Sequence, residues 1–158
     1  MFGILNHGEI EEVLRHQIIG RIGCHADGIT YIVPISYAYD GENIFAHTHE
    51  GMKISMMRKN PNICFEVDML QNMANWQSVI CWGIFEELLD PEERRNALER
   101  LHERVLPSVA SATTKLSSEW PFSPKDLNSI QGIVFRIRLD KKTGKFESSS
   151  KSSFFAMG

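Results

Sequence analysis

Apolar side chains recur at intervals of three and four residues from Ile10 to Ile18, which is the spacing of one face of an α-helix. Asn6 and Glu9 stand at the start of this run and Gly20 follows it, as expected for the two ends of a helix. The pattern predicts a short amphipathic helix near the N-terminus, which we expect to act as a lid or cap on the rest of the chain.

From residue 21 onward the pattern changes to runs rich in β-branched and aromatic residues, separated by turn signals. Two Asp-Gly pairs, at 27–28 and 40–41, divide the runs 21–25, 29–39 and 43–47. An Asp-Gly pair between such runs is a strong hairpin signal. The first third of the chain is therefore predicted to be a β-meander.

The middle of the chain alternates between short helices and strands. Residues 51–60 are predicted to form a short helix that Asn60-Pro61 ends, and residues 63–67 a buried strand. The run from Trp76 to Leu89 is the longest strand candidate, and its weak alternation indicates either burial on both faces or a bend at Gly83. We expect this strand to be central in the sheet.

The last part of the chain begins with a well-marked helix. Asp90 stands at its N-cap and Pro91 at its first position, and the helix is expected to run to Val105. Residues 108–127 carry little pattern and are predicted to be a loop with at most one helical turn. The remaining predicted elements are a strand over 130–139, a turn over 142–145, a strand over 146–149 and a loose tail over 150–158.

Composition agrees with one packed domain. The chain has 158 residues, 42% of them hydrophobic and 23% charged, which suffices for a core and does not favour disorder. No internal repeat or second domain is visible, so we expect a single domain over 1–158. About six antiparallel strands with peripheral helices predict a mainly β fold, a small closed or split β-barrel, because closure removes exposed sheet edges.

Charge and cysteine usage narrow the function classes. The formal net charge is −3, so no basic field is available to attract a nucleic-acid backbone, and duplex binding is not expected. No apolar run approaches the roughly 18–20 residues that span a bilayer, and the N-terminus lacks the features of a signal peptide, which predicts a cytoplasmic protein without a membrane partner. Cys24, Cys64 and Cys81 are odd in number and widely spaced, as expected for free, buried thiols.

The segment from Phe45 to Lys53 holds the densest group of chemically useful side chains, at the junction of a predicted strand and helix. A helix N-terminus offers unpaired amides and a partial positive charge, Gly51 allows close approach, and Thr48 and Lys53 add a hydroxyl and a cation. These features predict a phosphate-binding site, although the segment is not of the Walker type. The alternative is that Lys53 and Glu50 are solvated and Thr48 is an ordinary cap.

Other candidate groups carry weaker signals. His47 and His49 lie two residues apart at a strand end and share one face, so they could ligate a metal. No third ligand lies near them at a spacing typical of metal sites. Cys81 lies in an apolar strand and is expected to be an inert core thiol. The three tryptophans, with Tyr37 and Tyr39, could stack on an aromatic ligand or fill a core or a subunit interface.

Five sequence segments stand in an order that is itself informative. They are Gly20-Arg21-Ile22, Pro34-Ile35-Ser36-Tyr37, Ile44-Phe45-Ala46-His47-Thr48 followed by Glu50-Gly51-Met52-Lys53, residues 58–67, and Trp76–Leu88. Together they resemble the FMN-binding split-barrel family of the pyridoxamine 5′-phosphate oxidases, most closely its smaller branch that includes nitroimidazole-resistance reductases. The resemblance extends from the first predicted strand to the helix after Asp90, and residues 133–146 resemble the family more weakly.

The resemblance implies a homodimer with two FMN molecules at the subunit interface. By resemblance, His47, Thr48 and Lys53 would hold the ribityl phosphate. The isoalloxazine would lie beside Pro34, Ile35, Ser36 and Tyr37, and the pocket would be completed by Trp76, Gln77 and Ser78. The implied phosphate position agrees with the site predicted from the residues alone.

Two departures from the family pattern narrow the function. Met52 occupies the position of an Arg that the oxidases place before the phosphate-binding Lys, so a further phosphate partner must come from Arg21 or a backbone amide. The tail over 148–158 lacks the motif with which the longer oxidases grip their vitamin substrate, so vitamin B6 synthesis is not expected. In the nitroimidazole-resistance branch a histidine lies near the flavin at about the place of His47, which makes His47 the candidate catalytic residue.

The leading hypothesis is a FMN-dependent oxidoreductase that acts on a small molecule, with the flavin carrying the electron chemistry. One alternative is a nitroimidazole or nitroaromatic reductase, and another is a flavin- or haem-binding module without catalysis. Side chains alternate along a strand, so only one of His47 and Thr48 can face the cofactor squarely. His47 would then either donate a hydrogen bond to FMN or a substrate, or close a hydrogen bond within the barrel rim.

Overall fold

The computed structural model describes residues 1–104 and 126–149, which form eight strands and three α-helices. The helices are α1 (His7–His16), α2 (Met52–Lys59) and α3 (Pro91–Glu103), with a 3-10 turn η1 (Leu127–Ser129). The strands are β1 (Phe2–Ile4), β2 (Ile19–Ala26), β3 (Ile29–Ser36), β4 (Ala38–Tyr39), β5 (Asn43–Thr48), β6 (Asn62–Asn72), β7 (Asn75–Glu87) and β8 (Ile133–Glu147).

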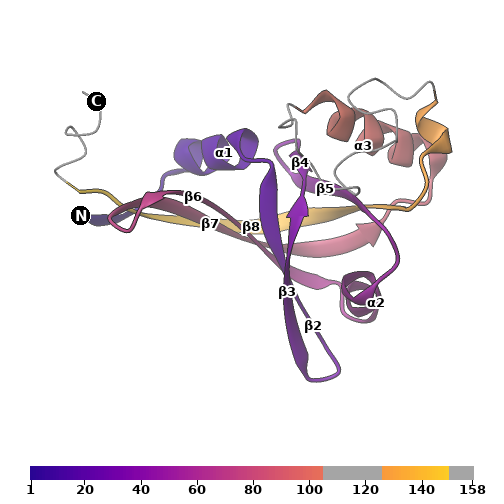
Figure 1. Ribbon diagram of the computed structural model, residues 1–158, viewed down its shortest axis with the longest axis horizontal. Helices are drawn as coiled ribbons and strands as arrows, with labels where there is room; N and C mark the ends of the chain where they lie inside the picture. The colour runs from indigo at the N-terminus through magenta and orange to yellow at the C-terminus, as the bar shows by residue number, and fades with distance from the viewer. Residues whose placement is uncertain (105–125, 150–158) are drawn as a thin grey trace.

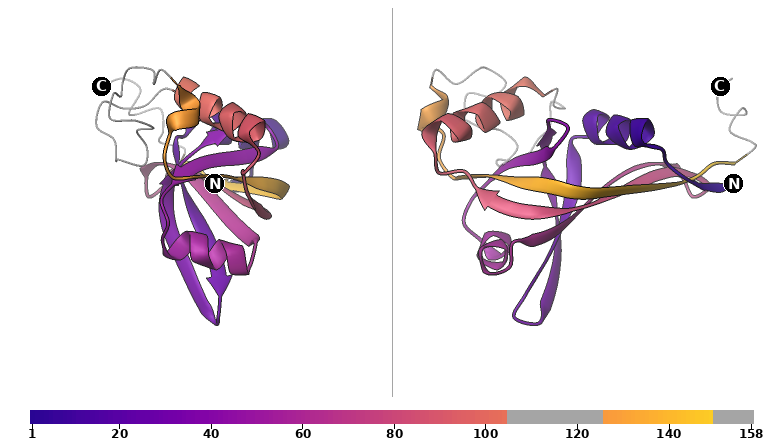
Figure 2. Two further views of the ribbon diagram at one scale, coloured as in Figure 1. Left: turned by 90° about the vertical axis from the view of Figure 1, so that its right-hand side faces the viewer. Right: turned by 180° about the vertical axis from the view of Figure 1, so that it is seen from behind.

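The strands of the described ranges form one antiparallel sheet with the order β3-β2-β6-β7-β8-β5-β4, and β1 pairs with the far end of β8. Figure 1 shows β6, β7 and β8 running along the molecule, with α1 and α3 above them and the β2–β3 hairpin extending below. The views in Figure 2 show the sheet strongly curved rather than flat. Because the edge strands β3 and β4 do not pair with each other, the fold is a split β-barrel with peripheral helices, as the sequence predicts.

Two hydrophobic clusters stabilise this arrangement. The main cluster fills the inside of the curved sheet and joins α1 and α2 to it. Its fully buried members include Leu14, Ile22, Ile54, Phe65 and Phe135. A second cluster packs α3 against the other face of β5 and β8 and includes Phe45, Leu98, Leu101 and Val134. Strand β5 therefore lies between the two clusters and buries both of its faces.

The three predicted helices and the central position of β7 are confirmed. At α1, Asn6 Oδ1 accepts from the Glu9 amide at 2.9 Å and Glu9 Oε2 accepts from the Asn6 amide at 2.8 Å, a reciprocal capping box. The pairing of β7 with β8 shifts register between Trp82 and Gly83. A Cβ at Gly83 would lie 2.3 Å from the Arg138 carbonyl oxygen, so close packing with β8 requires glycine there.

The β-meander predicted for the first third is confirmed in its two hairpins, but its middle strand, predicted over 29–39, is broken into β3 and β4. The Asp-Gly pairs do close the hairpins β2–β3 and β4–β5, and Asp27 and Gly28 both have positive φ. These hairpins, however, pair with β6 and β8 and not with each other. Between them Tyr37 is buried and its hydroxyl donates to the Leu14 carbonyl, where the chain passes from one sheet edge to the other. Turn chemistry closes each hairpin, whereas core contacts decide where the hairpin pairs.

The predicted turn over 142–145 is also wrong, because β8 continues without interruption to Glu147. Gly144 favoured the turn in the sequence, but it is needed for close packing. A Cβ there would lie 2.8 Å from Leu5 Cδ1 and 2.9 Å from Ile10 Cγ1. The sequence pattern also does not predict β1, which pairs with this end of β8.

Two predicted segments fall largely outside the described residues. Of the loop over 108–127 only residues 126 and 127 lie inside them, Leu127 being the first residue of the helical turn η1, and the tail over 150–158 lies outside. In the described part of the chain, no helix has the length and apolar character needed to cross a membrane.

Candidate functional site

The N-terminus of α2 differs from those of the other two helices. Gly51 is its N-cap and supplies no side-chain hydrogen bond, and the first turn carries no acidic residue. The helices α1 and α3 are capped by Asn6 and Asp90, with Glu9 and Glu93 in their first turns. The amides at the start of α2 therefore keep the partial positive charge of a helix end, with no capping side chain to accept from them.

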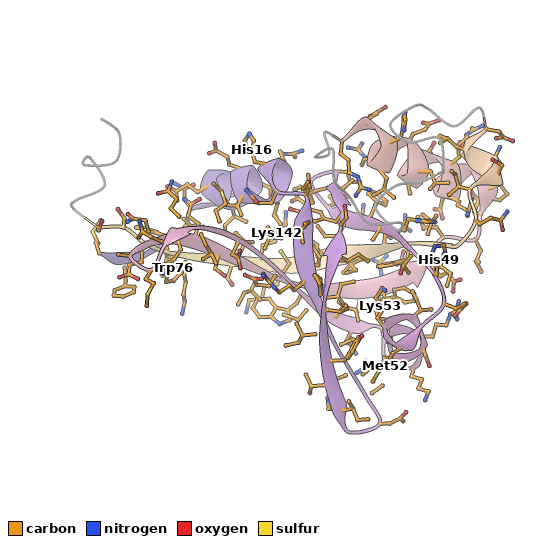
Figure 3. The ribbon with its side chains drawn as sticks, in the orientation of Figure 1. His16, His49, Met52, Lys53, Trp76 and Lys142 are labelled. Carbon is orange, nitrogen blue, oxygen red and sulfur yellow. The ribbon has the colours of Figure 1, made fainter. Side chains whose placement is uncertain are left out.

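Lys53 adds a full positive charge to the same end of α2 (Figure 3). Its side chain is half-buried, and it has no ion pair or hydrogen bond with any residue in the ranges 1–104 and 126–149. Lys59, at the other end of the helix, contacts Asp27 at 2.7 Å. Burial lowers the pKa of Lys53, and the neighbouring Cys24 opposes this shift. A partly desolvated ammonium without a counter-charge is well suited to bind an anion.

The alternation along β5 decides which way Thr48 and His47 point. Ala46 belongs to the main cluster inside the barrel, whereas Phe45 belongs to the cluster under α3. Thr48 therefore points with Ala46 toward the barrel side, where α2 also packs, and His47 points with Phe45 toward α3. Both side chains are buried, with exposures of 2% for Thr48 and 5% for His47.

His47 closes a hydrogen bond at the rim of the barrel. Its Nε2 donates to the Gln131 carbonyl, and its ring packs edge-on against that of His49 with 5.5 Å between centroids. Because a carbonyl only accepts, this contact fixes a proton on Nε2. Gly132 has φ of 100°, and a Cβ there would lie 2.8 Å from His47 Nε2. A hydrogen bond within the barrel rim is one of the two roles that the sequence leaves open for His47, but the sequence does not identify Gln131 as the partner.

The four residues predicted to lie beside an isoalloxazine have different surroundings. Pro34 is exposed and Ile35 is buried in the main cluster. The Ser36 hydroxyl accepts a hydrogen bond from Arg104 Nη1 at 2.7 Å. Tyr37 is buried and its hydroxyl is used by α1. In the single chain, Pro34 and Ser36 therefore present accessible atoms, whereas Tyr37 and Ile35 are core residues.

Trp76, Gln77 and Ser78 lie at the start of β7, toward the opposite end of the molecule from Lys53 and His49 (Figure 3). Trp76 Nε1 donates to Glu147 at 2.9 Å. Trp76 and Gln77 line a small surface pocket of about 300 Å³. A single chain does not bring this group to the start of α2.

The outer face of the sheet, opposite the main cluster, carries exposed apolar side chains beside charged ones. Ile32, Ile80 and Trp82 are exposed on it, next to a pocket of about 450 Å³ between β2, β6 and β7. Arg21, a predicted phosphate partner, lies on this face and pairs with two carboxylates of β6 at 3.1 and 2.9 Å. Unlike Lys53, Arg21 already has its counter-charges.

The cysteines and histidines offer little further chemistry. Among the described residues no group of three His, Cys, Asp or Glu side chains is arranged to hold a metal ion. Cys24, Cys64 and Cys81 are free, and burial raises the pKa of each thiol, that of Cys81 to about 12. Such thiols are poor nucleophiles at neutral pH. The chemistry of the candidate site therefore centres on Lys53 and the start of α2.

Fold and site together define a split β-barrel protein with a basic, uncapped helix end beside a buried strand end. Residues 6–146 match the family model for pyridoxamine 5′-phosphate oxidase, and the chain belongs to this family. The resemblance seen in the sequence is thereby confirmed.

Individual proteins resemble the chain over nearly its full length. An uncharacterized protein of Rhizobium meliloti is 26% identical over 142 residues, which are 90% of this chain and 93% of the other. The crystal structure of a FAD-binding protein of Mesorhizobium loti has 29% identity and a TM-score of 0.71, over 94% of this chain and 99% of the other. A candidate 5-nitroimidazole antibiotic resistance protein of Bacteroides thetaiotaomicron has 21% identity and a TM-score of 0.70, over 92% and 87%, and shows the same fold.

Proposed function

We propose that the protein is a FMN-dependent oxidoreductase that acts on a small molecule and holds the flavin phosphate at the start of α2. The observation that carries this proposal is the half-buried Lys53 ammonium, which has no ion pair in the described ranges and stands beside uncapped helix amides. A terminal phosphate carries roughly −1.5 to −2 charges and accepts several hydrogen bonds, which suits one cation and a helix end.

Family membership and one relative support a flavin as the carrier of that phosphate. The Mesorhizobium loti protein, at 29% identity, binds FAD. We favour FMN because its phosphate is terminal and Lys53 with the helix end can neutralise it. In FAD the pyrophosphate must continue past the same place to the adenosine.

The residues of the chain would bind and orient the flavin, which supplies hydride or electron transfer when bound. Thr48, on the barrel side of β5, would donate a hydrogen bond from its hydroxyl to the phosphate, and Pro34 and Ser36 would lie along the ring system. His47 points to the other side of β5 and is held by Gln131. We keep it as the candidate proton-transfer residue for a substrate that approaches from that side.

A second copy of the chain would complete the site. Trp76, Gln77 and Ser78 are too far along the sheet to meet Lys53 within one chain, and the open outer face exposes Ile32, Ile80 and Trp82. A homodimer that buries this face would cover the apolar side chains and bring the start of one β7 toward the α2 of its partner.

The visible spectrum of the purified protein tests the proposal most directly. We expect a flavin spectrum, release of FMN rather than FAD on denaturation, and a dimer by light scattering. A haem spectrum, or a colourless monomer that takes up neither added FMN nor FAD, would contradict it. Turnover of a nitroimidazole with a chemical reductant would identify the substrate class, and its absence in a flavin-loaded protein would leave other small molecules to be screened.

His47→Ala tests the catalytic role of that residue. We expect the variant to dimerise and retain most flavin, as measured by absorbance, but to lose turnover with any substrate found. Wild-type turnover at full flavin occupancy would instead make His47 a structural residue of the rim. Cell fractionation would test the predicted cytoplasmic location separately.

A further inference from the structure

Arg58 connects the segment before α2 to the central strand of the sheet. Its Nη1 and Nη2 donate to the two oxygens of Glu50, both at 2.9 Å. Its Nε and Nη2 donate to the two oxygens of Glu87, at 3.1 and 3.0 Å. Arg58 therefore makes two bidentate pairs, and these raise its pKa. Such a fork geometry is available to arginine and not to lysine.

Glu50 stands where a carboxylate would interfere with an anion site. It directly precedes Gly51, the N-cap of α2, and is three residues before Lys53. The positive end of a helix attracts carboxylates as well as phosphates. The side chain of Glu50 is 68% exposed, so packing does little to restrain it, and Arg58 is its only ion-pair partner within the described residues.

We propose that Arg58 is a positioning residue of the phosphate site. By pairing with Glu50 it holds this carboxylate away from the start of α2 and cancels its charge, so that Lys53 and the helix amides remain available to the flavin phosphate. Glu87 anchors Arg58, because it belongs to β7 and is paired there with Phe135 of β8. The inference rests on the proposed function, since it concerns the same phosphate.

A simpler role for Arg58 is that of a brace between α2 and β7. The two roles differ in what Glu50 does. If Arg58 only links α2 to β7, Glu50 is needed for that link, and removing the charge of Glu50 harms flavin binding as much as removing Arg58 does. As a carboxylate that must be masked, Glu50 is harmful once Arg58 is gone, and removing its charge restores binding.

Flavin titrations of Arg58→Gln, Glu50→Gln and the double variant separate these roles. For Arg58→Gln we expect the dissociation constant of FMN to rise roughly three- to tenfold at low salt and less at high salt, because an unmasked charge at this range is screened. Glu50→Gln should bind as tightly as wild type or tighter, and the double variant should recover most of the loss. Arg138→Gln is the matched control, because Arg138 is an exposed arginine paired with Glu86 at 3.1 Å.

Arg58→Lys covers the case in which Arg58→Gln does not fold, as judged by circular dichroism. Lysine keeps the charge but cannot make both bidentate pairs, so a smaller loss of affinity is expected, again reversed by Glu50→Gln. Unchanged affinity in the Arg58 variants, or a double variant no better than Arg58→Gln, would overturn the inference while Lys53→Ala still weakens binding. A wild-type protein that binds no flavin would overturn the proposed function and this inference with it.

Discussion

The N-termini of α2 and α3 are ends of the same kind of element built in opposite ways. Helix α3 begins at Asp90, whose Oδ2 accepts a hydrogen bond from the Glu93 amide at 3.1 Å, and Glu92 adds further negative charge. Helix α2 begins at Gly51, without a capping side chain or an acid in its first turn, and carries Lys53. The end of α3 is satisfied by the chain itself, whereas the end of α2 remains positive.

This difference concerns the stability that each helix end gains from its own residues. An N-cap side chain contributes about 1 kcal/mol, and acids in the first turn contribute some tenths more. The chain has a capping side chain and first-turn acids at α1 and α3 but neither at α2, so it lacks this stabilisation at the start of α2. Departures from local stabilising patterns, such as helix capping, are most often found at functional sites. Under the proposed function, α3 would serve folding and α2 binding, and substitutions at the two ends should have different consequences.

The largest expected effect is on flavin binding by Lys53→Ala. Charge-assisted hydrogen bonds contribute about 1.5–3 kcal/mol, so the dissociation constant of FMN should rise roughly ten- to a hundredfold. Fluorescence titration of the flavin-free protein measures this change. Lys59→Ala is the control on the same helix, because Lys59 already pairs with Asp27 on the surface and such pairs contribute little. Equal dissociation constants for the two variants would mean that the phosphate lies elsewhere.

Gly51→Asp should convert the start of α2 into one that resembles the start of α3. Among the described residues, a Cβ at Gly51 would meet only the His49 carbonyl oxygen, at 4.0 Å, so the new side chain has room there. A carboxylate there would cap the amides and occupy the place of the phosphate, and we expect about a tenfold loss of FMN affinity without loss of stability. Gly51→Ala is the uncharged control. If Gly51→Asp binds FMN like wild type, the helix end does not contact the phosphate.

Asp90→Ala is the reciprocal change at α3. Loss of the cap should lower the free energy of unfolding by about 1 kcal/mol, since α3 keeps its packing through Leu98 and Leu101. Urea unfolding measures this effect, and FMN affinity measured beside it should not change. Asp90→Asn, which can still accept the hydrogen bond, should recover most of the stability. A marked loss of flavin binding in Asp90→Ala would remove the distinction between the two helix ends.

Sequence reasoning predicted the parts of the fold that depend on local signals. The caps at Asn6 and Asp90, the hairpin at Asp27-Gly28 and the irregularity at Gly83 follow from residues close in the chain. Strand pairing does not, because it depends on contacts between distant segments. The unbroken middle strand predicted over 29–39 was wrong for this reason, and the turn around Gly144 was wrong because glycine serves close packing as readily as turns.

The candidate site, too, was predictable where it depends on residues close together in the sequence, and not where it depends on contacts between distant segments. A cation and a glycine at a strand–helix junction indicate an anion site, and the structure adds that Lys53 has no ion pair in the described ranges. The orientation of His47 relative to Thr48 could not be read from the sequence, because β5 is buried on both faces. The contacts of Arg58 with Glu50 and Glu87 depend on the end of β7 lying beside α2, which no short sequence pattern encodes.

The smallest expected effect concerns the stability of the flavin-free protein. Burial lowers the pKa of Lys53 in the folded state, so the unfolded chain binds more protons at pH values between the folded and unfolded pKa. Stability therefore rises with pH through that window, and at neutral pH the charged Lys53 destabilises the fold.

Lys53→Met keeps the length of the side chain and removes the charge. We expect this variant to be more stable than wild type near neutral pH, by less than about 1 kcal/mol because the ammonium is half-exposed and screened. The difference should shrink as the pH approaches about 10. Urea unfolding of both flavin-free proteins across this pH range measures the effect, with Lys59→Met as the control that should show no gain. A less stable Lys53→Met would mean that Lys53 supports the fold, and α2 would then no longer contrast with α3.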